Sequence, residues 1–179
     1  MKYTDLDLFF LWGPLHNELL SADKISDINE KGRIQYRTFF NMVESVSYRV
    51  RQILLSRYQN EEINLEYTEL IILKGENIEL NRNGKIAKKE KHYPFLQLFK
   101  FTVLLYASKY DKTEICENFF ATNGFESFQK ALQIRNKLIH PKSVKDINIH
   151  ENEYHFLENS REWFHEFMIS LFENDLIIE

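Results

Sequence analysis

The chain has 179 residues, of which 44% are hydrophobic and 28% are charged, and its formal net charge is −4. This length suits one hydrophobic core, so we predict a single domain over residues 1–179. The acidic balance argues against a broad surface that neutralises many phosphates, so any nucleic acid has to be bound locally. The one cysteine, Cys116, excludes an intrachain disulfide and suits a reducing compartment, so we expect a cytoplasmic protein.

The first residues give no targeting or membrane signal. Asp5, Asp7 and Pro14 interrupt a short apolar run, and no cleavage site of small residues follows it. Nowhere does the sequence reach the roughly 18 to 20 apolar residues that a membrane-spanning helix needs. We therefore expect no signal peptide and no membrane partner, and residues 1–32 are an N-terminal extension whose role the sequence does not assign.

The first predicted elements are a long helix and an insertion. Apolar side chains between Tyr36 and Tyr58 recur at spacings of three and four, which predicts an amphipathic helix. Residues from about 60 to 93 differ, because short apolar runs are separated by Lys74-Gly75 and by Asn83-Gly84, a strong turn signal. This segment is predicted to be a small β-hairpin inserted between helices, or else an irregular loop.

Two helices are predicted after this insertion. Residues 95–110 follow Pro94 and are apolar nearly all the way round, which is typical of a helix in the protein interior. A shorter helix is expected to start at Thr113, where the sequence is close to a capping box. Asn123-Gly124 is expected to end that helix, because glycine is favoured just beyond a helix C-terminus.

The last two helices complete the predicted fold. One runs from Phe125 and stops where His140 meets Pro141, because the residue before a proline is driven out of the α-helical region. The other is amphipathic and extends from Glu151 to Glu173. The fold class is therefore mainly α, a bundle of four to five helices with a small β-hairpin insertion.

Arg135 and His140 lie five residues apart at the end of the penultimate helix. On an ideal helix they would project about 140° apart, but Pro141 frees His140 to turn its imidazole back toward Arg135. An imidazole transfers protons near neutral pH, and a guanidinium offers planar donors to phosphate. Such a pair can transfer a phosphoryl group within RNA, with the 2′-hydroxyl as nucleophile and no metal. Alternatively, the two residues only terminate the helix.

The run "IRNKLIHPK" resembles the signature of the HEPN family, in which Arg, a polar residue, three variable residues and His follow one another near a helix end. Arg135, Asn136 and His140 match it in order. Residues 36–55 resemble the first long helix of HEPN proteins, including an acidic residue, Glu44. "GKIAKKEKHYPFLQLFKFTVLLYA" and the helix ending "REWFHEFM" resemble small bacterial HEPN proteins, so the likeness extends from about residue 33 onward.

The resemblance implies a HEPN-like bundle that acts as a metal-independent endoribonuclease without a cofactor. It implies a homodimer in which two Arg–His pairs share one cleft and produce a 2′,3′-cyclic phosphate and a 5′-hydroxyl. His140 would be the general base or acid, Arg135 would stabilise the pentacoordinate phosphate, and Asn136 would orient the reacting groups. Glu44 would orient Arg135 or His140. Such proteins serve as toxins or in antiviral defence against phage, restrained by an antitoxin or released by a sensor protein.

Lysines around the motif are candidate RNA contacts. We expect Lys130, Lys137 and Lys142 to bind the RNA backbone near Arg135. Lys142 also stands where some HEPN proteins that pair with a nucleotidyltransferase antitoxin carry a tyrosine that is modified, so that form of regulation is not expected here.

Two alternative functions stay open on the sequence. One is a non-catalytic HEPN-like module that binds RNA, nucleotides or another protein, and the other is a structural helical adaptor. A zinc site in "HENEYH" is rejected, because His150 and His155 are five residues apart rather than four. No metal is expected.

Overall fold

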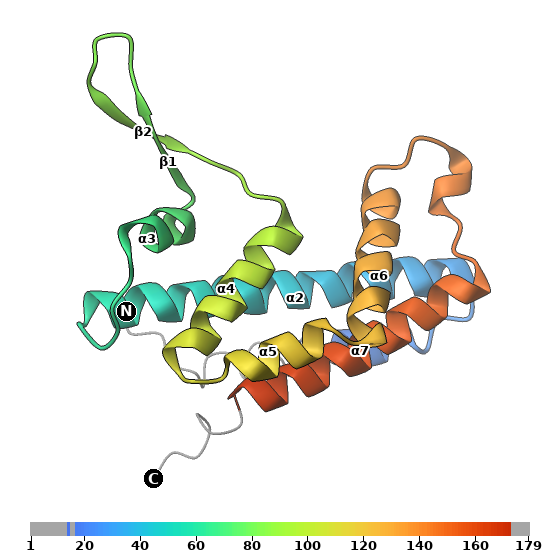
Figure 1. Cartoon of the computed structure of the whole chain (residues 1–179). Coiled ribbons are helices and arrows are strands. Elements are labelled where there is room, and N and C mark those ends of the chain that lie inside the picture. The colour runs from blue at the N-terminus through green and yellow to red at the C-terminus, as the bar shows by residue number, and fades with distance from the viewer. Residues whose placement is uncertain (1–13, 15–16, 173–179) are drawn as a thin grey trace.

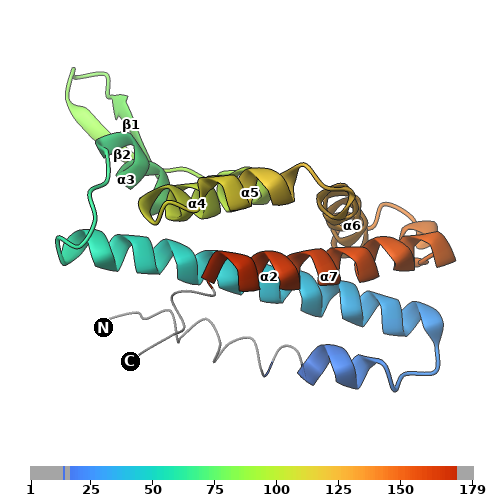
Figure 2. The same ribbon diagram turned by 60° about the horizontal axis from the view of Figure 1, so that its bottom comes forward.

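The computed structural model describes residue 14 and residues 17–172 (Figure 1), so residues 1–13, 15–16 and 173–179 lie outside the described part of the chain. The described part is mainly helical with one small β-hairpin, which confirms the prediction of a mainly α fold with a β-hairpin insertion. Helix α2 (Ile28–Gln59) and helix α7 (Glu151–Phe172) run along the molecule in the same direction, as Figures 1 and 2 both show. Helix α6 (Asn123–Ile139) crosses them and packs mainly against α7.

Helix α2 begins earlier than the predicted start at Tyr36. The Asp27 carboxylate accepts the N–H of Glu30 at 2.7 Å and so caps the helix before Ile28. The missed turns contain Gly32, which lowers helix propensity and weakened the sequence signal. The glycine has a packing reason, because a Cβ at this position would overlap the Tyr154 hydroxyl from α7.

The insertion holds a helix as well as a hairpin. Strands β1 (Glu76–Leu80) and β2 (Ile86–Glu90) pair antiparallel in the register Glu76↔Glu90, and Figure 1 shows them projecting away from the helices. The hairpin prediction is confirmed, but helix α3 (Tyr67–Lys74) precedes it and was not predicted. This helix has only 8 residues, a length at which a short apolar run reads equally well as a strand.

Helices α4 (Phe95–Lys109) and α5 (Thr113–Phe120) complete the core. Helix α4 packs on α2, and its residues Phe99 and Tyr106 are fully buried, as predicted for an interior helix. Cys116 is buried too, and this burial raises the pKa of its thiol to about 12, so the thiol is unreactive at neutral pH. Fully buried phenylalanine rings from α2, α4, α6 and α7 pack together in the core, and they include Phe39, Phe40, Phe99, Phe128, Phe164 and Phe167.

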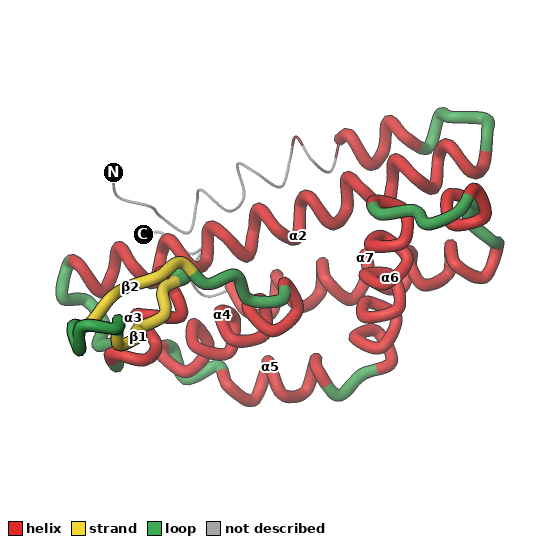
Figure 3. Tube along the Cα trace, turned by 90° about the horizontal axis from the view of Figure 1, so that it is seen from above, coloured by secondary structure: helices red, strands yellow, loops and turns green. Residues whose placement is uncertain are grey.

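The described residues contain the six α-helices α2 to α7 and a helical segment over residues 17–22, against a prediction of four to five helices; α3 and this segment were not predicted. Figure 3 shows from above that α3 and the hairpin lie at one end of the molecule, far from the end where α6 crosses α2. None of the helices within residues 17–172 combines the length and the apolar character needed to span a bilayer.

Two predictions about α5 and α6 are wrong. Thr113 does not cap α5, since the N-cap residue is Lys112 and no side chain caps that end. Asn123-Gly124 does not end a helix but begins α6. Gly124 is needed for close approach rather than for a left-handed turn, because a Cβ there would lie 2.8 Å from the Trp163 Cβ on α7.

We expect Gly124→Ala to lower the free energy of unfolding by about 1–3 kcal/mol, because the added methyl group pushes α6 away from Trp163. Urea unfolding followed by far-UV circular dichroism measures this change. Gln133→Ala, at an exposed position of the same helix, is the control and should change stability by less than about 0.5 kcal/mol. Equal stability of Gly124→Ala and wild type would contradict the close-packing explanation.

Candidate functional site

The end of α6 places His140 at the surface. The helix is regular to Ile139, and His140 is the C-cap residue with φ −121° and ψ 60°, outside the helical region, as predicted from Pro141. Its N–H still donates to the Asn136 carbonyl at 3.0 Å, so the backbone at the helix end is held. The side chain of His140 is exposed.

The loop after His140 is fixed by one carboxylate. Asp146 Oδ2 accepts the backbone N–H groups of Lys142 and Ser143, each at 2.8 Å, and these bonds hold the pKa of the Asp146 carboxyl below its usual range, the Lys142 N–H most strongly. The short 3₁₀ helix η1 (Val144–Ile147) follows directly. The residues next to His140 therefore have a defined path although they lie on the surface.

Arg135 connects α6 to α2 through an ion pair. Its Nη2 lies 2.7 Å from Glu44 Oε1, and its Nη1 donates to Asn136 Oδ1 at 3.2 Å. The Arg135 side chain is 17% exposed and that of Glu44 is 38% exposed. Each terminal nitrogen of a guanidinium carries two N–H groups, so each keeps one beyond these contacts. Two terminal donors of a permanent cation therefore remain for an anion, while Nε is buried without a hydrogen-bond partner.

The structure leaves His140 separate from this ion pair. No hydrogen bond or ion pair joins its imidazole to another residue in the described part of the chain. The turn of the imidazole toward Arg135, which Pro141 was expected to allow, produces no hydrogen bond between the two side chains and stays a prediction. Arg135 lies in the last turns of α6, and His140 is the C-cap residue of that helix and is open to solvent. A fixed cation and an exposed imidazole therefore lie five residues apart at this end of α6, with no hydrogen bond between them.

The three lysines proposed as RNA contacts have different surroundings. Lys137 Nζ lies 3.0 Å from Glu153 Oε1, and Lys130 Nζ lies 5.0 Å from the centre of the Phe156 ring, so both side chains also fasten α6 to α7. Lys142 is exposed beside His140. Contact with RNA stays a prediction for all three residues.

Sequence reasoning did not single out Tyr48 and Arg51, which share the face of α2 that carries Glu44. Tyr48 is 50% exposed, and the guanidinium carbon of Arg51 lies 5.2 Å from the centre of its ring. The sequence spacing could have identified both residues, because residues four and seven positions after Glu44 fall on the same side of a helix. An exposed aromatic and a cation therefore extend the surface next to the Arg135–Glu44 pair.

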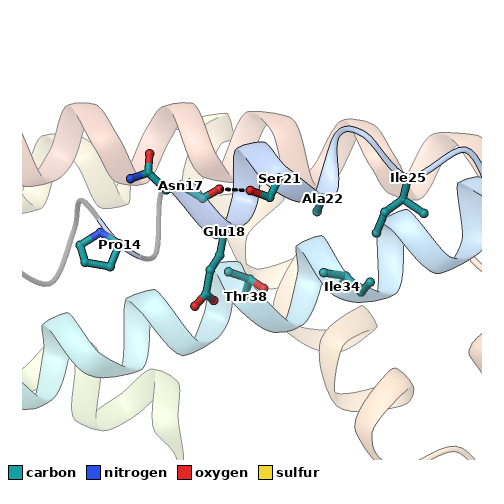
Figure 4. Close-up of a pocket in the computed structure, with 8 residues that line it drawn as sticks. All are labelled: Pro14, Asn17, Glu18, Ser21, Ala22, Ile25, Ile34 and Thr38. Carbon is teal, nitrogen blue, oxygen red and sulfur yellow. Dashed lines mark hydrogen bonds between the residues drawn. The ribbon is translucent and has the colours of Figure 1, made fainter.

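A hollow of about 410 Å³ lies elsewhere, between the helical segment over residues 17–22 and α2 (Figure 4). Its described lining contains one titratable side chain, Glu18, which points toward Thr38 of α2. A second hollow of about 690 Å³ is lined partly by Glu158, Glu162 and His165 of α7. Among the described residues no group of three His, Cys, Asp or Glu is arranged to hold a metal ion. Neither hollow includes Arg135 or His140.

No family model matches the chain, and neither a curated protein nor a solved structure is significantly similar to it. Its function is therefore inferred from the chemistry at the end of α6.

Proposed function

We propose that this protein is a metal-independent endoribonuclease of the HEPN type. The observation that supports this most directly is the pairing of Arg135 with Glu44 at 2.7 Å, five residues before an exposed histidine. The carboxylate holds the guanidinium in one orientation while two of its terminal donors stay unused, which is the arrangement needed to bind a phosphate that gains charge. His140 adds a group that transfers protons near neutral pH.

The proposed reaction breaks one phosphodiester bond within RNA. The 2′-hydroxyl oxygen attacks the neighbouring phosphorus, and a neutral His140 imidazole accepts the hydroxyl proton. The bond between phosphorus and the 5′-oxygen then breaks, and an imidazolium returns a proton to that oxygen. Arg135 stabilises the pentacoordinate phosphate, and the products are a 2′,3′-cyclic phosphate and a 5′-hydroxyl.

A homodimer is part of this proposal, because base and acid act on opposite sides of the phosphorus and two copies supply two imidazoles. In this arrangement Asn136 and Glu44 orient Arg135, with which each already makes a contact. A toxin or antiviral defence role, with an antitoxin or sensor protein as regulator, belongs to the same proposal.

The proposal is tested by incubating the purified protein with RNA in excess EDTA. We expect cleavage that is unaffected by the chelator, because the reaction needs only the 2′-hydroxyl, an imidazole and a guanidinium. The products should carry 2′,3′-cyclic phosphate and 5′-hydroxyl ends, which are identified by mass spectrometry. Products with 5′-phosphate ends, or cleavage that EDTA abolishes, would contradict this mechanism.

A second candidate is a non-catalytic module that binds RNA, nucleotides or another protein. The observation that favours it is the absence, among the described residues, of any side-chain partner that orients the His140 imidazole. A catalytic histidine is usually held in one tautomer by such a partner. This candidate predicts RNA or protein binding that leaves the RNA chain intact, so the same incubation separates the two functions.

A further inference from the structure

The exposed face of α2 next to Arg135 combines an aromatic ring with cations. Residues four and seven positions after Glu44 project within about 40° of it on a helix, so Tyr48 and Arg51 continue its side of α2. In the other direction Arg37 and Asn41 are exposed on that side as well. We name this set the α2 stripe, and it consists of Arg37, Asn41, Glu44, Tyr48 and Arg51.

The charge of this surface is positive although the whole chain is acidic. The α2 stripe and Arg135 together carry three guanidinium groups against a single carboxylate, Glu44, which Arg135 already neutralises. Within the described residues no carboxylate pairs with Arg51. A polyanion that enters the site at Arg135 can therefore continue along α2 toward Arg51 without meeting an unpaired negative charge from the α2 stripe.

Tyr48 gives this surface a preference for unpaired bases. Half of the residue is exposed, and Arg51 lies over the ring at 5.2 Å, where the contact between cation and ring holds both side chains in place. A tyrosine ring at a solvent-open position offers a flat face on which a nucleobase stacks, but the bases of a duplex already stack on one another. Arg51, which no carboxylate of the described residues pairs with, supplies a cation beside that ring.

We propose that Tyr48 and Arg51 form a subsite that binds an unpaired nucleotide of single-stranded RNA, next to the phosphate held by Arg135. This inference rests on the proposed function and adds a nucleotide-binding subsite on α2 to it. Because a base on Tyr48 fixes the strand beside the site, the protein selects single-stranded over double-stranded RNA. The preference comes from stacking, which every base offers, so it does not depend on base identity.

Binding of a labelled 2′-O-methyl oligonucleotide to the full chain tests this subsite, because the blocked 2′-oxygen prevents cleavage. Fluorescence anisotropy should show Tyr48→Ala raising the Kd about 10-fold, whereas Tyr48→Phe keeps the ring and stays within about twofold. Tyr67→Ala is the matched control, because Tyr67 is 62% exposed but lies on α3, and it should leave the Kd unchanged. Arg51→Gln should lower the slope of log K against log salt by about 0.7.

The outcomes separate this subsite from the nuclease itself. Tighter binding of the single strand than of a duplex of the same sequence supports the subsite. A higher Kd of Tyr48→Ala for the single strand supports it as well. Equal Kd values for Tyr48→Ala and wild type, in a protein that cleaves RNA, overturn the subsite and leave the proposed function in place. Failure of wild type to bind any single-stranded oligonucleotide overturns both.

Discussion

Replacing His140 with alanine is expected to slow RNA cleavage by about 10²–10⁴-fold, the usual contribution of a positioned acid or base. The imidazole is the proposed carrier of the proton that leaves the 2′-hydroxyl and of the proton that reaches the departing 5′-oxygen. The fold should stay intact, because His140 is exposed and its backbone N–H bond to Asn136 does not involve the side chain. A loss of this size without a change of structure would assign chemistry to the residue rather than a helix stop.

The rate of cleavage of a labelled RNA in excess EDTA measures this effect, and thermal unfolding of each variant reports the fold. His155→Ala is the matched control, because its side chain is 73% exposed and its Nδ1 lies 3.7 Å from Glu158 on the same helix, α7. We expect that control to cleave like wild type. In cells, expression of wild type but not of His140→Ala should slow growth if the protein is a toxin. Equal cleavage rates for His140→Ala and wild type would exclude this histidine from the reaction.

The parts of the fold that were predictable have one strong local signal. Helix α4 is apolar nearly all round, and α6 ends at His140 because Pro141 forbids its continuation. The errors occur where one residue type has two uses. Gly124 follows an asparagine as a helix-ending glycine would, but it sits inside α6 because only a residue without Cβ lets Trp163 approach so closely. In a single sequence, a glycine that ends a helix looks the same as a glycine that allows two helices to pack closely.

The positions of the site residues along the chain were predictable, but their arrangement in three dimensions was not. The sequence gives the positions of Arg135, Asn136 and His140, and the resemblance implied an acidic residue facing them. The contact itself joins residues 91 positions apart and depends on how α6 crosses α2. Likewise, a lysine that could bind RNA and one that pairs with α7 look alike in a sequence, and only packing shows that Lys137 lies 3.0 Å from Glu153.

Arg135→Lys is the second change with a large expected effect, and it keeps the positive charge. We expect cleavage to fall about 10²–10³-fold, the usual cost of removing a donor from a site that stabilises developing charge. A guanidinium can bind Glu44 and Asn136 and still present two N–H groups in a fixed plane, whereas an ammonium concentrates its donors on one atom. A lysine that keeps the ion pair with Glu44 therefore cannot also bind phosphate in the bidentate geometry.

Steady-state kinetics separate this role from simple attraction of RNA. Because the phosphate gains charge only in the transition state, Arg135→Lys should lower kcat and leave KM nearly unchanged. Glu44→Gln removes the charge that orients Arg135 but keeps an oxygen that accepts its N–H, so it should lower kcat by a smaller factor than Arg135→Lys. If Arg135→Lys instead raises KM at constant kcat, the guanidinium binds RNA without stabilising the transition state, and charge alone explains its presence at the end of α6.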